Sequence, residues 1–194
     1  MSLSAARLPL AVGALTLCAL LGVVVSVNAG VSAGTASDRD QIVAVLRESI
    51  RARGMAARTF DTSSFATIFI DDPNTPLNAT QNEFIARFAP QSASGGLLTY
   101  YEGYFAHWQA GVSALHRVQA ARAAGQAPAP GDLRAMAAPR TDPLVIPAII
   151  IKSLTITGDR AYFEADTEPA YYRLSLIRVA GRWLIAGETA TVRG

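Results

Sequence analysis

The pattern of apolar and polar positions divides the chain into an apolar beginning and a mixed remainder. Residues 8–27 are all apolar or small, and Arg7 is the one charged side chain among residues 1–37. A helix needs about 20 such residues to cross a bilayer. Two interpretations stay open: residues 1–29 are a cleaved signal peptide, or they are a membrane anchor that remains attached.

The charges on either side of this run predict its orientation. Arg7 and the amino terminus precede the run and Asp38 follows it, so the N-terminus is expected to stay on the inner side of the membrane. Both interpretations therefore predict an extracytoplasmic protein, secreted or anchored in the cell membrane. We expect residues 30–36 to form a spacer and residues 37–194 to form one domain.

Apolar residues at helical spacing predict three helices in the first part of this domain. The first is expected to begin at Ser37 and to stop at Gly54. The second would follow Asp61, whose carboxylate would cap it, and would end before Pro73. Its inward-facing residues would be Phe65, Ile68 and Phe69. The third would follow Thr80, with Glu83 as the partner in a capping box.

The strongest periodic signal predicts one long amphipathic helix over about residues 96–124. Its apolar positions step by three and four residues: Leu98, Tyr101, Phe105, Trp108, Val112 and Leu115. We expect this aromatic face to pack on a sheet of the same domain, because it is too short and too poorly flanked by charges for a coiled coil. Residues 125–147 are rich in Ala, Pro and Gly, and predict a long surface loop or a short helix after Asp132 between two loops.

The last third of the chain is typical of strands. Residues 149–157 are apolar and β-branched, and Gly158-Asp159 suits a hairpin turn. Two further segments alternate between apolar and polar positions, and after a turn at Ala180-Gly181 a last strand begins at Arg182. Helices first and an antiparallel meander last predict the α+β fold class, with N-terminal helices packed on a curved C-terminal sheet.

The C-terminal segment resembles the NTF2-like superfamily, the SnoaL-like or cystatin-like α+β roll proteins. The resemblance is carried by Ile156-Thr157-Gly158-Asp159-Arg160-Ala161, by residues 174–179, and by Gly181-Arg182-Trp183-Leu184-Ile185. It covers about half of the domain. It implies a curved sheet wrapped around helices with a cone-shaped pocket between them. The family contains isomerases, hydrolases, ligand binders and non-catalytic assembly domains, so the fold does not select a function.

Composition excludes several classes of function. The 17 basic and 15 acidic residues leave no strongly basic surface for nucleic acid. The single cysteine, Cys18, lies in the apolar leader, so the domain has no thiol for catalysis or for a zinc site. The two histidines, His107 and His116, are nine residues apart and point to opposite sides of one helix. We therefore predict no metal, no cofactor and no nucleic-acid partner.

One strip of the long helix could line a ligand pocket. Tyr100, Tyr104 and His107 lie beside the core stripe, where tyrosines could donate hydrogen bonds and a histidine could carry a proton. They could equally lie at the boundary of the core, with their polar ends in water. These three residues are the predicted ligand-binding set, and no residue is predicted to be catalytic.

Other polar pairs have simpler explanations. Glu164 and Asp166 share a strand face and resemble an acid–base pair, but that face is expected to be exposed. For Arg173 and Glu188 two interpretations stay open, an ion pair across the sheet or a site for an anionic ligand. Asp71-Asp72 is interpreted as a helix end.

The sequence thus favours a non-catalytic binding or interaction domain with an unknown ligand. The alternative is a small cofactor-independent isomerase or hydrolase that uses Tyr104 and His107 in a helix-lined pocket. Expected partners are the membrane, through an uncleaved N-terminal segment, and a protein or second copy, through the sheet face that carries Tyr171 and Arg173.

Overall fold

The computed structural model describes residues 36–92, 95–141, 144–168 and 170–192. The apolar leader predicted over residues 1–29 and the spacer up to residue 35 lie outside this part of the chain. Among the described helices, none combines the length and the hydropathy that a bilayer crossing requires.

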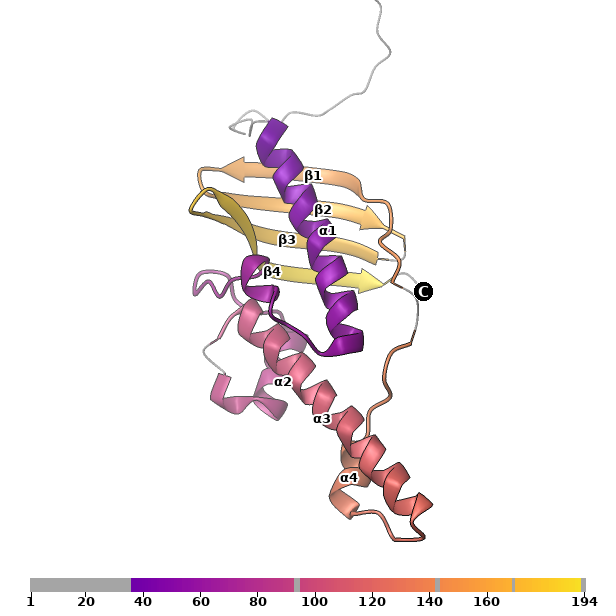
Figure 1. Cartoon of the computed structure of the whole chain (residues 1–194). Coiled ribbons are helices and arrows are strands. Elements are labelled where there is room, and N and C mark those ends of the chain that lie inside the picture. The colour runs from indigo at the N-terminus through magenta and orange to yellow at the C-terminus, as the bar shows by residue number, and fades with distance from the viewer. Residues whose placement is uncertain (1–35, 93–94, 142–143, 169, 193–194) are drawn as a thin grey trace, which may run out of the picture.

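Helix α1 (Ala36–Thr59) lies across one face of a four-stranded sheet (Figure 1). The prediction that Gly54 ends this helix is wrong. Ala56 and Ala57 are buried and continue the apolar face beyond it. The helix ends where Phe60 takes a left-handed conformation, with a φ of 59°, and donates its N–H to the carbonyl of Ala56.

The helix predicted after Asp61 is also absent, and its residues form a short 3₁₀ turn, η1 (Phe65–Thr67). The carboxylate of Asp61 accepts the Ser63 N–H at 2.9 Å and closes a local turn. The segment then joins the edge of the sheet, because Phe69 forms a parallel bridge with Ile185. Phe65, Ile68 and Phe69 are buried as predicted.

Helix α2 (Ala79–Phe88) begins with a capping box, but not the predicted one. Asn78 accepts from the Gln81 N–H, and the Gln81 side chain accepts from the Asn78 N–H. Thr80 and Glu83 therefore have no part in the cap. A 3₁₀ turn, η2 (Pro90–Ser92), follows.

Helix α3 (Leu97–Ala123) confirms the predicted long helix. At the start of α3, the Thr99 N–H donates to the carboxylate of Asp71 at 3.1 Å. Asp71 therefore caps a helix from a position 28 residues earlier in the chain. Helix α4 (Pro130–Ala135) is the short helix that was one of two alternatives for residues 125–147, and it starts before Asp132. It packs on the outer end of α3, which projects beyond the sheet (Figure 1).

The four strands form one antiparallel sheet in the order β1-β2-β3-β4. Gly158 has a φ of 58° in the first turn, and Ala180 and Gly181 have positive φ in the last, as the hairpin signals predict. The strand bounds are Ile150–Thr157 for β1, Arg160–Thr167 for β2, Ala170–Val179 for β3 and Arg182–Val192 for β4. The fold is therefore α+β, as predicted.

The core lies between the inner face of the sheet and the helices. Its largest fully buried side chains include Trp183, Phe163, Phe65, Phe69, Ile42 and Leu46. Tyr101 and Phe105 of α3 join this core, so the helix does pack on the sheet as expected. Trp108 is half-buried and packs against the edge of this core. It lies on the projecting part of α3, with its ring against Phe60 and its indole N–H on the carbonyl of Ala138 at 3.0 Å.

Candidate cleft between two helices and the sheet

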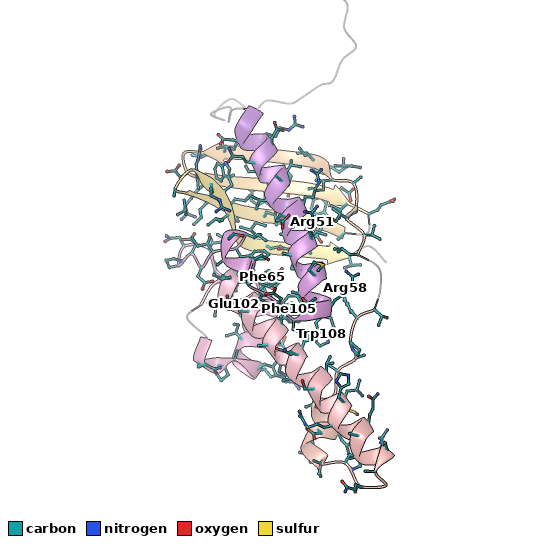
Figure 2. The ribbon with its side chains drawn as sticks, in the orientation of Figure 1. Arg51, Arg58, Phe65, Glu102, Phe105 and Trp108 are labelled. Atoms are coloured by element: carbon teal, nitrogen blue, oxygen red, sulfur yellow. The ribbon has the colours of Figure 1, made fainter. Side chains whose placement is uncertain are left out.

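A cleft of about 510 Å³ lies where the C-terminal half of α1 faces α3. This volume is in the range of pockets that hold small organic ligands. Figure 2 shows Arg58 on α1 and Phe105 and Trp108 on α3 at this place. The lining residues are Ile50, Arg53, Gly54, Ala57, Arg58, Tyr100, Tyr101, Tyr104, Phe105, Trp108, Arg140, Leu144, Val145 and Tyr172.

Helical geometry explains why α1 and α3 supply most of this lining. On α1 the lining residues step through positions 50, 53, 54, 57 and 58, and on α3 through 100, 101, 104, 105 and 108. Each set lies on one face of its helix, because residues three and four apart stack above each other. The α3 set is entirely aromatic, so one wall of the cleft consists of rings.

A third wall comes from the segment that follows α4. It carries Leu144 and Val145, and a Cβ added to Gly54 would lie 2.2 Å from the Leu144 side chain. At Gly111 of α3, an added Cβ would lie 2.7 Å from Ala137, whose N–H donates to the Gly111 carbonyl. The segment thus packs closely on both helices where they lack side chains.

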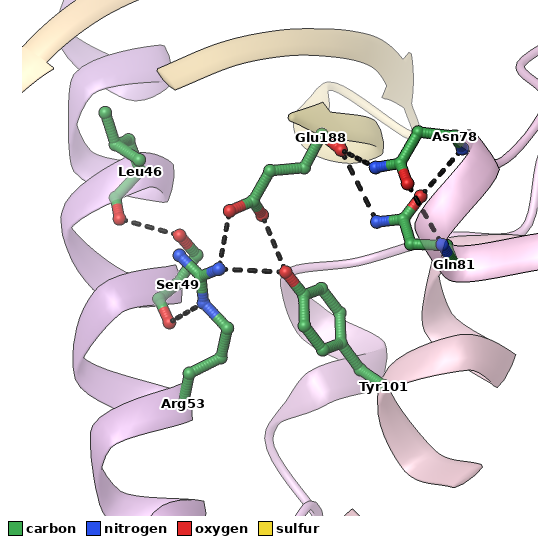
Figure 3. A network of polar contacts seen from close by, with 7 residues as sticks. All are labelled: Leu46, Ser49, Arg53, Asn78, Gln81, Tyr101 and Glu188. Carbon is green, nitrogen blue, oxygen red and sulfur yellow. Dashed lines mark hydrogen bonds and ion pairs between the residues drawn. The ribbon is translucent and has the colours of Figure 1, made fainter. Parts of the chain in front are cut away.

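At the polar floor of the cleft, a buried carboxylate faces an arginine and a tyrosine (Figure 3). The Arg53 guanidinium donates to Glu188 at 2.5 Å and to the Tyr101 hydroxyl at 2.8 Å. The Tyr101 hydroxyl donates to the second oxygen of Glu188 at 3.1 Å. The Glu188 side chain is 2% exposed and that of Arg53 is 18% exposed. The three groups satisfy one another's charge and hydrogen bonding in the core.

Further contacts fix both ends of this network. The Arg53 Nε donates to the Ser49 carbonyl at 3.2 Å, one helical turn earlier. The main-chain carbonyl of Glu188 accepts from Asn78 at 3.1 Å and from Gln81 at 3.4 Å (Figure 3). The residues that cap α2 therefore also hold the end of β4, and α1, α2, α3 and β4 meet at one point.

Three phenols of the cleft lining, those of Tyr100, Tyr101 and Tyr172, stay protonated at neutral pH. Burial raises the pKa of Tyr100 to about 12 and also raises the pKa of Tyr172. Burial raises the pKa of Tyr101 well above its ordinary value, against the opposing effect of Arg53. Burial, the largest single effect, would lower the pKa of Arg53, but the attraction and hydrogen bond of Glu188 together with Tyr101 and Tyr172 outweigh it and raise the pKa. Arg53 is therefore a permanent cation.

Of the predicted ligand-binding residues, the structure brings two into the cleft. Tyr100 and Tyr104 both line it. His107 does not. His107 is exposed, and the centre of its ring lies 4.2 Å from the centre of the Phe88 ring. It lines a second, smaller hollow of about 190 Å³ beside α4.

The other polar residues weighed from the sequence fall outside the cleft. Glu164 pairs with Arg173 at 3.2 Å on the outer sheet face, as expected of an exposed face. Asp166 on the same strand is buried, contrary to that expectation. Arg173 and Glu188 do not pair, because they lie on opposite faces of the sheet. Among the described residues, no group of three or more His, Cys, Asp or Glu side chains could hold a metal ion.

The sequence did not indicate the role of Arg53 and Glu188. One signal was present: Arg53 follows Ile50 by three residues and so continues the apolar stripe of α1. Glu188 could not be found in this way. A β-bulge in the pairing of β3 with β4 lies between Ile185 and Gly187 and shifts the alternation by one residue. It turns Glu188 to the core face, opposite Leu174.

Comparison of the chain with family models, with curated proteins and with solved structures finds no match. The function must therefore be inferred from the cleft itself.

Proposed function

We propose that this protein is an extracytoplasmic binding domain that holds a small organic ligand in the cleft between α1, α3 and β3, without catalysing a reaction. The observation that carries the proposal is the cleft itself, about 510 Å³ with an aromatic wall. The α+β architecture is compatible with an NTF2-like roll, to which we assign the chain on its C-terminal sequence. The apolar leader supports the location.

The polar floor of the cleft favours binding over catalysis. Glu188 is the one buried carboxylate at this floor, and Arg53 and Tyr101 both hold it. The usual general bases are an imidazole or a carboxylate within reach of the substrate, whereas this carboxylate is engaged and His107 lies outside the cleft. The alternative enzyme, with Tyr104 and His107 as a pair, would have to work in the smaller hollow of about 190 Å³ that both residues line, and not in the cleft.

A neutral fluorescent probe tests the binding function. Phenylnaphthylamine is an apolar ring compound that fluoresces when it leaves water, and it accepts energy from a nearby tryptophan. We expect one probe per chain, with energy transfer that falls in Trp108→Phe, and weaker binding in Tyr104→Ala. Trp183 is buried, is not in the cleft lining and donates to Asp38 near the start of α1, so it serves as the internal reference. Absence of Trp108-dependent transfer, or turnover of a substrate that requires His107, would contradict the proposal.

The location and the partners need separate tests. The mass of the mature N-terminus will distinguish a cleaved leader from a membrane anchor, and protease treatment of intact cells will show on which side the domain lies. We further propose that the outer sheet face around Tyr171 and Arg173 contacts a protein partner or a second copy. The guanidinium of Arg173 lies 5.5 Å from the centre of the Tyr171 ring on this face. A dimer in light scattering that Arg173→Glu dissociates would support the second copy.

A further inference from the structure

The donor and acceptor content of the cleft indicates which chemistry its ligand brings. Among the described lining residues, the polar side chains are the arginines and tyrosines, and none carries a carboxylate or a carboxamide. Arginine only donates hydrogen bonds, whereas a tyrosine hydroxyl can donate one and can also accept. Donors therefore outnumber acceptors in the lining, which favours a ligand that supplies acceptors.

The charge of the lining agrees with this. Three lining residues are arginines: Arg53, Arg58 and Arg140. Glu188 faces Arg53 from below the floor and is not itself in the lining. Arg140 is exposed at the mouth, with its guanidinium 5.7 Å from the centre of the Trp108 ring. A guanidinium in this position can bind a planar carboxylate or a related group through two parallel hydrogen bonds.

The apolar part of the lining indicates the body of the ligand. Tyr100, Tyr104 and Trp108 are successive turns of one helix, and Tyr172 and Leu144 come from other segments of the chain. Aromatic walls of this kind bind flat ring systems, because offset or edge-to-face contacts add to simple burial.

Resting on the proposed function of the cleft, we infer that its ligand is an aromatic anion: a flat ring body that lies against α3 and carries one anionic oxygen group, which Arg140 binds at the mouth. The ring body enters between the tyrosines, and the charged group stays at the rim in reach of water. Such an orientation avoids burial of the ligand's charge in the core.

A matched pair of probes tests this inference. Anilinonaphthalene sulfonate has the rings of phenylnaphthylamine with one sulfonate added, so the two differ in the anionic group. We expect the sulfonate to bind about tenfold more tightly to the wild-type chain, the gain typical of a charge-assisted hydrogen bond. Arg140→Gln should remove most of this difference, because it weakens binding of the sulfonate far more than binding of the neutral probe. Arg140 is exposed, so this variant keeps the fold.

Arg122→Gln is the matched control, because it removes the same charge from an exposed position of α3 outside the cleft lining. It should change neither affinity. If the neutral probe binds as tightly as the sulfonate, or if Arg140→Gln weakens both equally, the aromatic anion is refuted while the binding function stands. If neither probe shows transfer from Trp108, the proposed function and the inference both fail.

Discussion

Replacing Glu188 by glutamine would remove the one charge that neutralises Arg53 in the core. The two side chains are 2% and 18% exposed and their charged atoms are 2.5 Å apart. Glutamine keeps the shape of the side chain and one acceptor oxygen. The variant therefore isolates the charge, and the packing around α1, α3 and β4 is left in place.

The expected cost follows from this burial. Removing one partner of a fully buried ion pair destabilises a protein by about 3–5 kcal/mol, since the other charge is left without compensation. Here Arg53 also lines the cleft, where water can solvate part of its guanidinium. We therefore expect Glu188→Gln to lower the free energy of unfolding by about 2–3 kcal/mol. For a domain of this size, that corresponds to a fall in Tm of about 5–10 °C.

Urea unfolding followed by circular dichroism measures this loss, and a double-mutant cycle assigns it to the pair. Arg53→Met alone should be costly as well, because it leaves a carboxylate in the core. The double variant Arg53→Met/Glu188→Gln should lose less than the sum of the two, by about 1 kcal/mol or more. Glu164→Gln breaks an ion pair on the outer sheet face, where Arg173 is 58% exposed, and should cost under about 1 kcal/mol.

Two results would refute this reasoning. One is a Glu188→Gln variant as stable as the wild type, which would mean that Arg53 finds its solvation elsewhere. The other is simple additivity in the cycle, which would mean that each side chain acts through its own packing.

Three further outcomes are expected. A methyl group at Gly111 would meet the segment after α4 at 2.7 Å, so Gly111→Ala should cost about 1–2 kcal/mol in urea unfolding. A Cβ at Gly103 would lie 3.7 Å from that of Ala89, an ordinary contact, so Gly103→Ala should be neutral or stabilising. Hydrogen bonds, first from Thr75, lower the pKa of Asp72 to about 2. Its contribution is therefore complete above about pH 4 and lost as the pH falls to 2, and Asp72→Asn should flatten this part of the stability profile. His107→Gln should leave binding of the neutral probe in the cleft unchanged, and a loss of affinity would place that side chain at the site.

Local patterns predicted most of the elements but not the way in which they meet. The long helix and the hairpins follow from periodicity and turn residues, which act within a few positions of the chain. The segment after Asp61 was misassigned because Phe65, Ile68 and Phe69 also suit helical spacing. In the fold they are placed instead by pairing with β4, more than 100 residues later. Such pairing leaves no local signal.

At the candidate site too, local patterns predicted some residues, while contacts between distant segments placed the others. Tyr100 and Tyr104 were found because the strip beside an amphipathic stripe can be drawn from the sequence. His107 shares that strip, but Phe88 of another helix holds its ring at a different place. Glu188 was hidden by a single extra residue in β4, which reverses the side of the sheet for every position after it.

Some residues of the cleft can be substituted without disturbing the fold, and others cannot. Arg53 and Tyr101 belong to the floor, and the same bonds that shape it also hold α1 and α3 to the sheet. Arg140 and Val145 belong to the rim and are exposed. A new ligand preference can therefore evolve by substitutions in the segment after α4 at little cost in stability, while the floor is inherited unchanged.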